Sequence, residues 1–279
     1  MTPVGATPVV VKLGGSCLED MAGDWWADLA AHARVAPVVL VHGWSKPLKR
    51  LRARYRDPSA VLRDRYGNQS RWTTPEVVED ILAVSAGLAV EVADRLRPHG
   101  VAVDRVLGRD GLLSAAPGER WYWRDKRLVE IDNLVGPISG VDPAALGGLA
   151  PGRVVLVTPL ARDERGRTVN TDADRAAAAV AGALGAPALA LVTDVPFLLI
   201  DGEPVRAISA TSARLFRDKH AVGGMRKKLR AADEGLAGGV ERVVIGSAPL
   251  SELLAGATGT VITPDEPAGL VAAAAETSA

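Results

Sequence analysis

Little in this sequence points to disulfides, membranes or nucleic acid. Cys17 is the single cysteine among 279 residues, so an internal disulfide is excluded and a reducing compartment, the cytoplasm, is expected. No run of 18 apolar residues occurs, and the N-terminus lacks the basic and apolar segments of a signal peptide, so we expect neither a membrane span nor export. The 33 basic and 33 acidic residues balance to a formal net charge of +0, which argues against a nucleic-acid partner.

Several familiar signatures of catalysis are also missing. The chain has no G-x-x-x-x-G-K-S/T phosphate loop, no H-E-x-x-H or paired C-x-x-C zinc motif, and no G-x-S-x-G nucleophile turn. Its four histidines do not cluster in the sequence, and His42, at the end of an expected strand, is interpreted as structural. We therefore expect no metal site built from side chains.

Short β-branched runs alternate with longer amphipathic stretches, as in an α/β protein. The runs are almost continuously apolar, which is typical of strands buried on both faces of a largely parallel sheet. They cover residues 8–13, 37–42, 153–158, 188–194 and 242–246. The alternation of strands with helices predicts a doubly wound sheet.

Three helices are expected between these strands. Thr74 and Pro75 suit the N-cap and first turn of one, which Pro98 would stop. A second is expected to follow Asp174 and end at Gly185. A third is expected from about residue 225 to residue 236.

Four polar or glycine-rich segments remain once these elements are assigned. Two follow strands, at residues 12–16 (KLGGS) and 42–45 (HGWS), and two open helices, at residues 170–175 (NTDADR) and 223–228 (GGMRKK). Glycine loops after strands let backbone N–H groups approach an anion, and helix N-termini add a positive dipole. Two distant lysines, Lys12 and Lys228, could then meet at one polyphosphate.

In this order the segments resemble the amino acid kinase family, within it the acetylglutamate kinase-like branch, and most closely the LysW-type carrier-protein-linked kinases. The resemblance covers nearly the whole chain and rests on the stretches VVVKLGG, VLVHG, SRWTTPEV, LGRDGLLSAA, VNTDADRAAAAVAGAL, LVTDVPFLLIDG, GGMRKKLRAA and GVERVVIGS. It implies an open αβα sandwich with a central, mostly parallel sheet, the amino acid kinase or carbamate kinase-like fold. It also implies one domain over residues 1–279, with an acceptor-binding lobe (1–160) and an ATP-binding lobe (161–279), and a homodimer.

The resemblance implies phosphoryl transfer from ATP, with Mg²⁺, to a carboxylate. Lys12 and Lys228 would clamp the transferring phosphate, and Asp174 would hold both lysines. A carboxylate acceptor has a pKa of about 4.3 and is already ionised at neutral pH, so no general base is required. The product would be an acyl phosphate.

The resemblance also assigns binding residues to each substrate. Arg71 would pair with the acceptor's α-carboxylate, a role that suits a bidentate guanidinium. The full acceptor-binding set is Gly43, Trp44, Ser45, Arg71, Asn170 and Asp172. The ATP-binding set is Gly14, Gly15, Ser16, Thr193, Asp194, Gly224 and Met225.

Two positions depart from the family pattern. Trp44 replaces the middle glycine of the second loop, and Phe197 replaces a glycine near the nucleotide. We interpret the Trp44 indole as one wall of the acceptor entrance. Because both changes lie near the expected site, a catalytically weak homologue that acts as a sensor or binding subunit stays open as an alternative.

Three acceptors remain open. The acceptor is free N-acetylglutamate, or an α-aminoadipate or glutamate joined through its amino group to a small acidic LysW-type carrier protein, or another small molecule such as isopentenyl phosphate or carbamate. Arg71 in SRWT and Lys228 in GMRKK favour the first two over the third. The stretches SRWT and DADR are closer to the carrier-protein kinases.

One segment of this neutral chain is strongly basic. Residues 46–71 carry nine basic side chains, and only Asp57 and Asp64 oppose them. The segment lies between the second glycine loop and the expected acceptor hairpin. It is therefore predicted to dock an acidic carrier protein, although a solvated basic helix stays an alternative. The nine are Lys46, Lys49, Arg50, Arg52, Arg54, Arg56, Arg63, Arg65 and Arg71.

Overall fold

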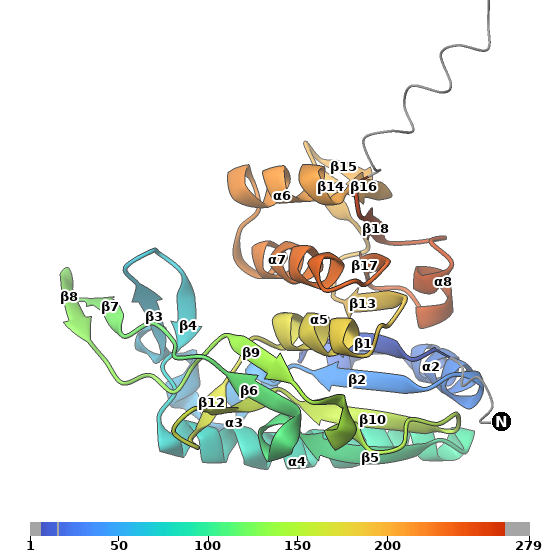
Figure 1. The fold of residues 1–279 in the computed structure, drawn as a ribbon, viewed down its shortest axis with the longest axis horizontal. Helices are drawn as coiled ribbons and strands as arrows, with labels where there is room; N and C mark the ends of the chain where they lie inside the picture. The colour runs from blue at the N-terminus through green and yellow to red at the C-terminus, as the bar shows by residue number, and fades with distance from the viewer. Residues whose placement is uncertain (1–6, 16, 266–279) are drawn as a thin grey trace, which may run out of the picture.

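The centre of the molecule is an eight-stranded sheet (Figure 1). The computed structural model describes residues 7–15 and 17–265. Across the sheet the strands are β16 (Ala207–Ser209), β18 (Thr260–Thr263), β17 (Arg242–Gly246), β13 (Ala188–Val192), β1 (Val9–Leu13), β2 (Val38–His42), β10 (Arg153–Thr158) and β5 (Ala102–Leu107). The pair β17–β18 is antiparallel and the other pairs are parallel. The predicted α/β fold with a central, mostly parallel sheet is confirmed.

The inner strands are buried on both faces, as their apolar runs predict. Every residue of β1, β2 and β13 is buried. Successive side chains of a strand point to opposite faces, so Val10 joins one hydrophobic core while Val9 and Val11 join the other. Strands of both expected lobes lie in this one sheet. The division at residue 160 stays a prediction.

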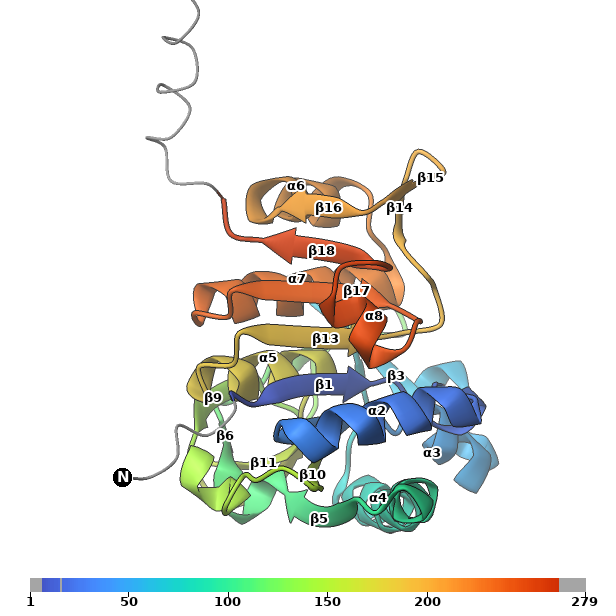
Figure 2. The ribbon, with the colours of Figure 1, turned by 90° about the vertical axis from the view of Figure 1, so that its right-hand side faces the viewer.

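Helices cover both faces of the sheet (Figure 2). The core containing Val10 also holds residues of α5 (Ala173–Ala183), α6 (Ala210–Lys219) and α7 (Gly223–Ala237). The opposite core holds residues of α2 (Gly23–Val35), α3 (Ser45–Leu51), α4 (Pro75–Leu96) and α8 (Leu250–Leu254). The arrangement is the expected αβα sandwich. None of the described helices is both long and apolar enough to cross a bilayer.

The ends of three helices test the capping signals. Thr74 caps α4, with its side chain accepting from the Val77 N–H, as predicted. The prediction for α5 was wrong at both ends. The N-cap is Asp172, whose carboxylate accepts from the N–H groups of Asp174 and Arg175, and the helix ends at residue 183. Helix α7 likewise begins two residues before the expected residue 225.

A smaller four-stranded sheet projects from the body at the left of Figure 1. Its order is β4 (Gln69–Arg71), β3 (Val61–Asp64), β7 (Trp121–Arg124) and β8 (Arg127–Glu130). The other strands are β12 (Thr168–Asn170), β11 (Leu160–Asp163), β6 (Leu113–Ala115) and β9 (Ile138–Val141) in a second small sheet, and β14 (Leu198–Ile200) with β15 (Glu203–Val205) in a hairpin. The short helical segments are α1 (Cys17–Asp20), η1 (Ala53–Arg56), η2 (Pro58–Ala60), η3 (Arg97–His99), η4 (Gly108–Leu112) and η5 (Pro143–Leu146).

Candidate active site

Two lysines meet one carboxylate between β1, α5 and α7. Lys12 lies on the same face of β1 as Val10, which is the face that α5 and α7 cover. Its Nζ lies 2.8 Å from Oδ1 of Asp174, in the first turn of α5. Lys228 Nζ, from α7, lies 3.5 Å from Oδ2 of the same carboxylate. The structure thus brings together the three residues predicted to handle the transferring phosphate.

The cluster is buried, and it holds two positive charges against one negative charge. Lys12 is only 6% exposed, and burial acts to lower its pKa, but the charge and hydrogen bond of Asp174 outweigh this and raise it. Burial and the charge of Lys12 lower the pKa of Lys228. Burial opposes ionisation of Asp174, but the two lysines lower its pKa. Two ammonium groups against one carboxylate leave an excess of positive charge, which suits an anionic ligand.

The glycines of the first two loops let the backbones touch. A Cβ atom at Gly43 would lie 2.8 Å from the backbone N of Gly15, and a Cβ at Gly15 would lie 3.0 Å from the backbone of Gly43. Side chains at these two positions would force the loops apart. The loops follow the parallel strands β1 and β2, so they meet at the carboxyl edge of the sheet, where ligands of α/β proteins bind.

A cavity of about 520 Å³ lies at this edge, a size that suits a nucleotide. Six of the seven predicted ATP-binding residues line it together with Lys12 and Lys228: Gly14, Gly15, Thr193, Asp194, Gly224 and Met225. The seventh, Ser16, lies outside the described residues. Ser45, predicted to bind the acceptor, lines the same cavity.

Two polar groups predicted to bind the acceptor are buried without a hydrogen-bond partner among the residues that the structure describes. Nη1 of Arg71 and Oδ1 of Asn170 are buried and accept or donate no hydrogen bond. They are linked through Thr73, whose hydroxyl donates to the Arg71 carbonyl and accepts from the Asn170 amide nitrogen. Burial lowers the pKa of Arg71. Unpaired buried groups are costly, so a donor and an acceptor left open here suit a polar ligand.

Asp172 and Trp44, both expected to bind the acceptor, have structural surroundings. Besides capping α5, Asp172 places Oδ2 3.5 Å from Nζ of Lys227. Trp44 is 8% exposed and packs within the core that contains α2 and α4, and it does not line the cavity. The indole therefore packs into the core and does not line the nucleotide-sized cavity, and its interpretation as one wall of the acceptor entrance stays a prediction.

His42 is structural, as the sequence indicated. It is fully buried, with Nε2 hydrogen-bonded to the Thr158 hydroxyl at 3.1 Å. Burial lowers its pKa to about 4, so the ring is neutral at physiological pH. It is not poised to exchange a proton with a substrate.

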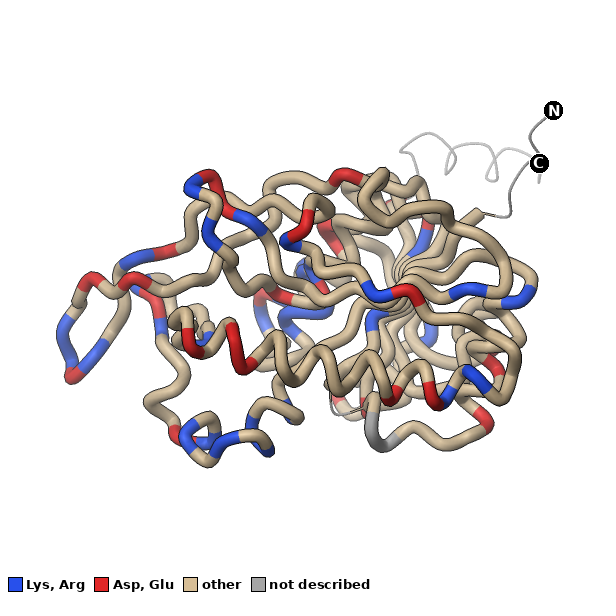
Figure 3. Tube along the Cα trace, turned by 90° about the horizontal axis from the view of Figure 1, so that it is seen from below, with Lys and Arg blue, Asp and Glu red and all other residues tan. Residues whose placement is uncertain are grey.

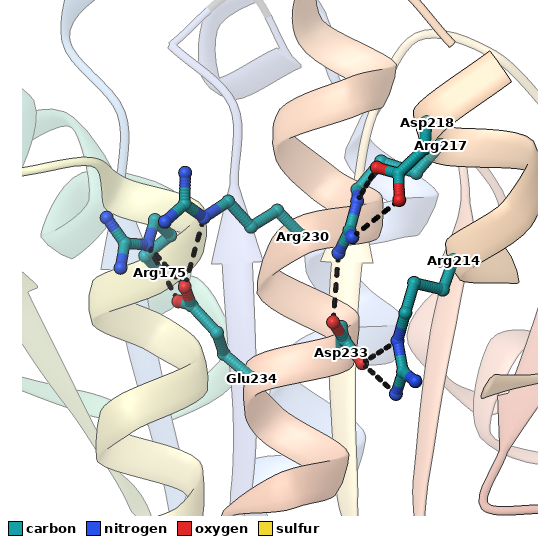
Figure 4. Close-up of polar contacts among 7 residues, drawn as sticks. All are labelled: Arg175, Arg214, Arg217, Asp218, Arg230, Asp233 and Glu234. Atoms are coloured by element: carbon teal, nitrogen blue, oxygen red, sulfur yellow. Dashed lines mark hydrogen bonds and ion pairs between the residues drawn. The ribbon is translucent and has the colours of Figure 1, made fainter. Parts of the chain in front are cut away.

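Ion pairs fix the helix that carries Lys228 (Figure 4). Glu234 of α7 receives Arg175 of α5, with Nε 2.7 and 2.9 Å from its two oxygens. On the other side of α7, Asp233 pairs with Arg214 and Arg217 of α6 at 2.8 and 2.9 Å. Helix α7 is thereby tied to both neighbours, and Asp174 and Lys228 keep their relative position.

Two arginines of the basic segment are paired with acids of α4. Asp80 of α4 receives Nε of Arg52 at 2.8 Å and Nη2 of Arg54 at 2.8 Å, and it also accepts from the Tyr55 hydroxyl. Arg54 also pairs with Glu76 at 2.8 Å. Figure 3 shows the acidic positions of α4 beside this segment. The prediction that nine cations form one open docking surface therefore needs correction.

Sequence reasoning missed three lysines near the site. Lys46 and Lys49 line the cavity from α3, although the sequence assigned them to carrier docking. Lys227 pairs with the cap of α5. In the sequence, Lys46 and Lys49 are marked only by following the second loop, and Lys227 only by lying beside Lys228. Such positions do not distinguish a side chain that lines a cavity from one in solvent.

The lining of the cavity fits a Mg²⁺ ion that arrives with a nucleotide. Among residues 7–15 and 17–265, no group of three potential metal ligands occurs. Asp194 contributes a lining carboxylate, which accepts from the Thr193 hydroxyl at 3.1 Å and has no ion-pair partner in the described part of the chain. Mg²⁺ is commonly held by one or two carboxylates together with substrate phosphates, so the lining fits an ion delivered with a nucleotide.

The order of loops around the cavity agrees with a known family. The profile of the amino acid kinase family matches residues 7–247.

The chain belongs to the amino acid kinase family.

Its relatives in the amino acid kinase family carry two kinds of name. An acetylglutamate kinase of Geobacillus stearothermophilus is 35% identical over 244 residues, which cover 85% of this chain and 88% of that protein. A protein of Aeropyrum pernix named LysW-aminoadipate/LysW-glutamate kinase is also 35% identical, over 274 residues that cover 91% of this chain and 97% of that protein. Kinases that act on a carboxylate are thus found among its relatives, and the two names do not agree on one acceptor.

Solved structures share the fold. N-acetylglutamate synthase from Neisseria gonorrhoeae, complexed with coenzyme A and N-acetylglutamate, aligns with a TM-score of 0.75 at 24% identity and covers 94% of this chain. This chain spans 60% of that synthase. Carbamate kinase from Giardia lamblia aligns with a TM-score of 0.65 at 14% identity, over 94% of this chain. These likenesses support the αβα fold alone.

Proposed function

We propose that this amino acid kinase transfers the γ-phosphoryl group of ATP to the side-chain carboxylate of an acidic amino acid whose amino group is blocked. The observation that carries the proposal is the buried Lys12–Asp174–Lys228 cluster in a cavity of nucleotide size. Asn170 precedes Asp174 by four residues, so the unpartnered groups on the acceptor side are joined to the cluster by a short connection.

In the proposed reaction a carboxylate oxygen attacks the γ-phosphorus. The bond from that phosphorus to the β–γ bridging oxygen breaks, ADP leaves, and an acyl phosphate forms. The acceptor is already ionised, so no residue has to remove a proton. Lys12 and Lys228 neutralise the charge on the transferring group, and Asp174 holds both ammonium groups in place. Mg²⁺ supplies further neutralisation of the phosphates when it is bound.

The backbone contributes on the nucleotide side. The Gly14-Gly15 loop clears space for phosphate oxygens, and Thr193, Asp194, Gly224 and Met225 also line the cavity. We assign Arg71 and Asn170 to the acceptor, because a guanidinium Nη and an amide oxygen are buried there without partners. Gly43, Ser45 and Asp172 remain proposed members of the acceptor side.

For the acceptor, we favour α-aminoadipate or glutamate carried on a small acidic LysW-type protein. The stretches SRWT and DADR support it, as does the relative of that name that spans 91% of this chain. Free N-acetylglutamate is the second candidate, because relatives named acetylglutamate kinase match at the same identity. We further propose that the kinase is a cytoplasmic homodimer, as the resemblance implies.

The experiment measures acyl phosphate trapped by hydroxylamine, together with ADP release. The wild-type kinase is assayed with a LysW-type carrier bearing α-aminoadipate and with free N-acetylglutamate, and Lys12→Ala serves as the control. Carrier-dependent hydroxamate that disappears in the control is the expected result. Preference for N-acetylglutamate would support the kinase activity but contradict the proposal of a carrier-linked acceptor. ADP and hydroxamate absent with both acceptors, despite ATP binding, would overturn the kinase and favour a sensor.

A further inference from the structure

The projecting four-stranded sheet has one face on which large apolar side chains gather. Antiparallel pairing places Arg63 opposite Trp123, and Trp123 opposite Leu128. Trp121 and Val61 lie two residues from these positions along their strands and therefore share the face. We call Val61, Arg63, Trp121, Trp123 and Leu128 the outer face.

The apolar members of the outer face are open to solvent. Val61 is 40% exposed, Trp121 40%, Trp123 47% and Leu128 38%, whereas Leu62 and Tyr122, on the other face, are buried. Two exposed tryptophans side by side with aliphatic neighbours are unusual on a surface that contacts only water. Aromatic side chains of this kind often anchor protein partners.

The charges around the outer face are mainly basic. Arg63 and Lys126 have no acidic partner among the described residues, while the nearby Arg65 and Arg120 are paired with Glu119 and Glu130. Glu130 lies opposite Trp121, whereas Arg127 pairs with Arg124 on the other face of the sheet. The one unpaired acid in the β7–β8 turn is Asp125. An acidic partner therefore complements this surface, in contrast to the segment around Arg52 and Arg54, whose charges α4 already satisfies.

The outer face is continuous with the acceptor side of the site. Arg71, which we assign to the acceptor, lies on β4 of the same sheet and is paired directly with Val61. A macromolecule that rests on the outer face can therefore extend a chain end past β4 toward Arg71 and Asn170. A free amino acid derivative would fill the site without touching Trp121 or Trp123.

We propose that the outer face docks the small acidic carrier protein that presents the acceptor. The proposal rests on the proposed function, because it supplies the partner for the same site. Trp121 and Trp123 are the anchors, Val61 and Leu128 enlarge the apolar contact, and Arg63 and Lys126 steer and orient the acidic partner. The docking surface is thus moved from the predicted segment 46–71 to the projecting sheet, and that segment contributes to it through Val61, Arg63 and Arg71.

The test measures binding of a LysW-type carrier protein from the same organism, without an attached amino acid, to immobilised kinase. Trp123→Ala is expected to weaken binding about 30-fold, the loss typical of a hot-spot tryptophan. Arg63→Glu is expected to weaken it and to reduce its dependence on salt. Leu215→Ala is the matched control, because Leu215 is 54% exposed on α6, away from the sheet, and binding should not change.

Three outcomes would overturn the docking proposal. If Trp123→Ala binds the carrier as wild type does while wild-type kinase phosphorylates carrier-linked aminoadipate, the carrier docks elsewhere and the proposed function stands. If wild type neither binds nor phosphorylates the carrier but phosphorylates N-acetylglutamate, the proposals of carrier docking and of a carrier-linked acceptor are both wrong. The proposed kinase activity then stands. If Trp123→Ala changes the molar mass measured by light scattering, the outer face joins two copies of this chain.

Discussion

A single buried carboxylate organises the candidate site. Asp174 receives both Lys12 and Lys228, and removing one partner from a buried ionic cluster leaves its charge uncompensated. Burial, and after it the charge of Lys12, lower the pKa of Lys228, and the shared carboxylate of Asp174 does not fully offset them. An arriving phosphate would favour the protonated form of Lys228. In the proposed reaction, binding of the phosphate would therefore also set the charge of the lysine that assists the transfer.

Lys228→Ala is expected to lower kcat by about 10²–10³-fold, because one cation that neutralises the transferring phosphate is lost. Lys12→Ala should act similarly. Lys227→Ala is the matched control, since this neighbour on α7 is half exposed and pairs with the α5 cap. Steady-state kinetics measures kcat, and circular dichroism checks that each variant is folded. Near-normal turnover in Lys228→Ala would remove that lysine from the mechanism.

His42 is expected to make folding sensitive to mild acid. Burial lowers its pKa to about 4 in the folded protein, against about 6.5 when unfolded. The unfolded chain therefore takes up a proton first as the pH falls, and stability is lost between about pH 6.5 and pH 4. The loss amounts to roughly 3 kcal/mol over that window.

Urea unfolding of wild type and His42→Gln across this pH range measures the effect. The variant should be less stable at pH 7, because the hydrogen bond to Thr158 is disturbed, but its stability should fall less steeply toward pH 4. Parallel pH profiles for the two proteins would show that His42 is not the titrating group.

At the scale of elements, two acids of α4, Glu76 and Asp80, hold part of the basic segment against that helix. Arg52, between α3 and η1, and Arg54 of η1 converge on Asp80 of α4, so this part of the chain owes its position to ion pairs as well as to packing. Reversal of Arg52, Arg54 and Arg56 to glutamate would therefore place acids beside Asp80. Such a variant would test folding of the segment before it tested docking.

Asp80→Asn is expected to lower the free energy of unfolding by about 1–2 kcal/mol at pH 7. The hydrogen bond from Arg52, aided by Tyr55 and Arg54, lowers the pKa of Asp80 to about 2 in the folded state. This contribution is complete above about pH 4, the unfolded pKa, and is lost as the pH falls toward 2.

Denaturant titrations at neutral pH and near pH 2.5 measure the Asp80 contribution. Wild type and Asp80→Asn should differ at neutral pH and converge in acid. Glu79→Gln, an exposed position on the same helix, is the control and should change stability little. An equal difference at both pH values would mean that the charge of Asp80 is not responsible.

At the scale of the whole molecule, zero net charge hides an uneven distribution. Acids of α4 neutralise one basic region, while the projecting sheet keeps unpaired cations beside the acceptor side. The two groups of basic residues differ in whether acids of the fold pair with them. The charge that a binding protein meets is therefore set by the fold.

Turnover of a carrier-linked acceptor is expected to weaken steeply as salt rises through physiological ionic strength, where the Debye length is about 8 Å. KM for the carrier should increase, because exposed cations steer an acidic protein. KM for ATP and for free N-acetylglutamate should vary less, since the cluster at Lys12 is buried. An equal response to salt for the carrier-linked and free acceptors would remove the electrostatic contribution to docking.

The sequence by itself determined the fold class and singled out Lys12, Asp174 and Lys228, which the structure brings together. Apolar runs such as 9–13 and 38–42 can be satisfied only by burial on both faces, and the loops that follow parallel strands meet at one edge. Because these signals are local, they predicted the strands, and with them the position of Lys12 near the loops that follow the other parallel strands. Local competition was harder to predict: Asp172 rather than Asp174 caps α5, since its carboxylate reaches two N–H groups.

Tertiary structure alone decided which charges and aromatic rings are free. The sequence showed Arg52 and Arg54 as open cations, but Asp80, more than 25 residues later, pairs with both. It showed Trp44 in a ligand loop, but the fold turns the indole into the core, and it gave no signal that Trp121 and Trp123 would face outward beside Arg71. Neutralisation and exposure depend on contacts between distant segments, which spacing along the chain does not encode.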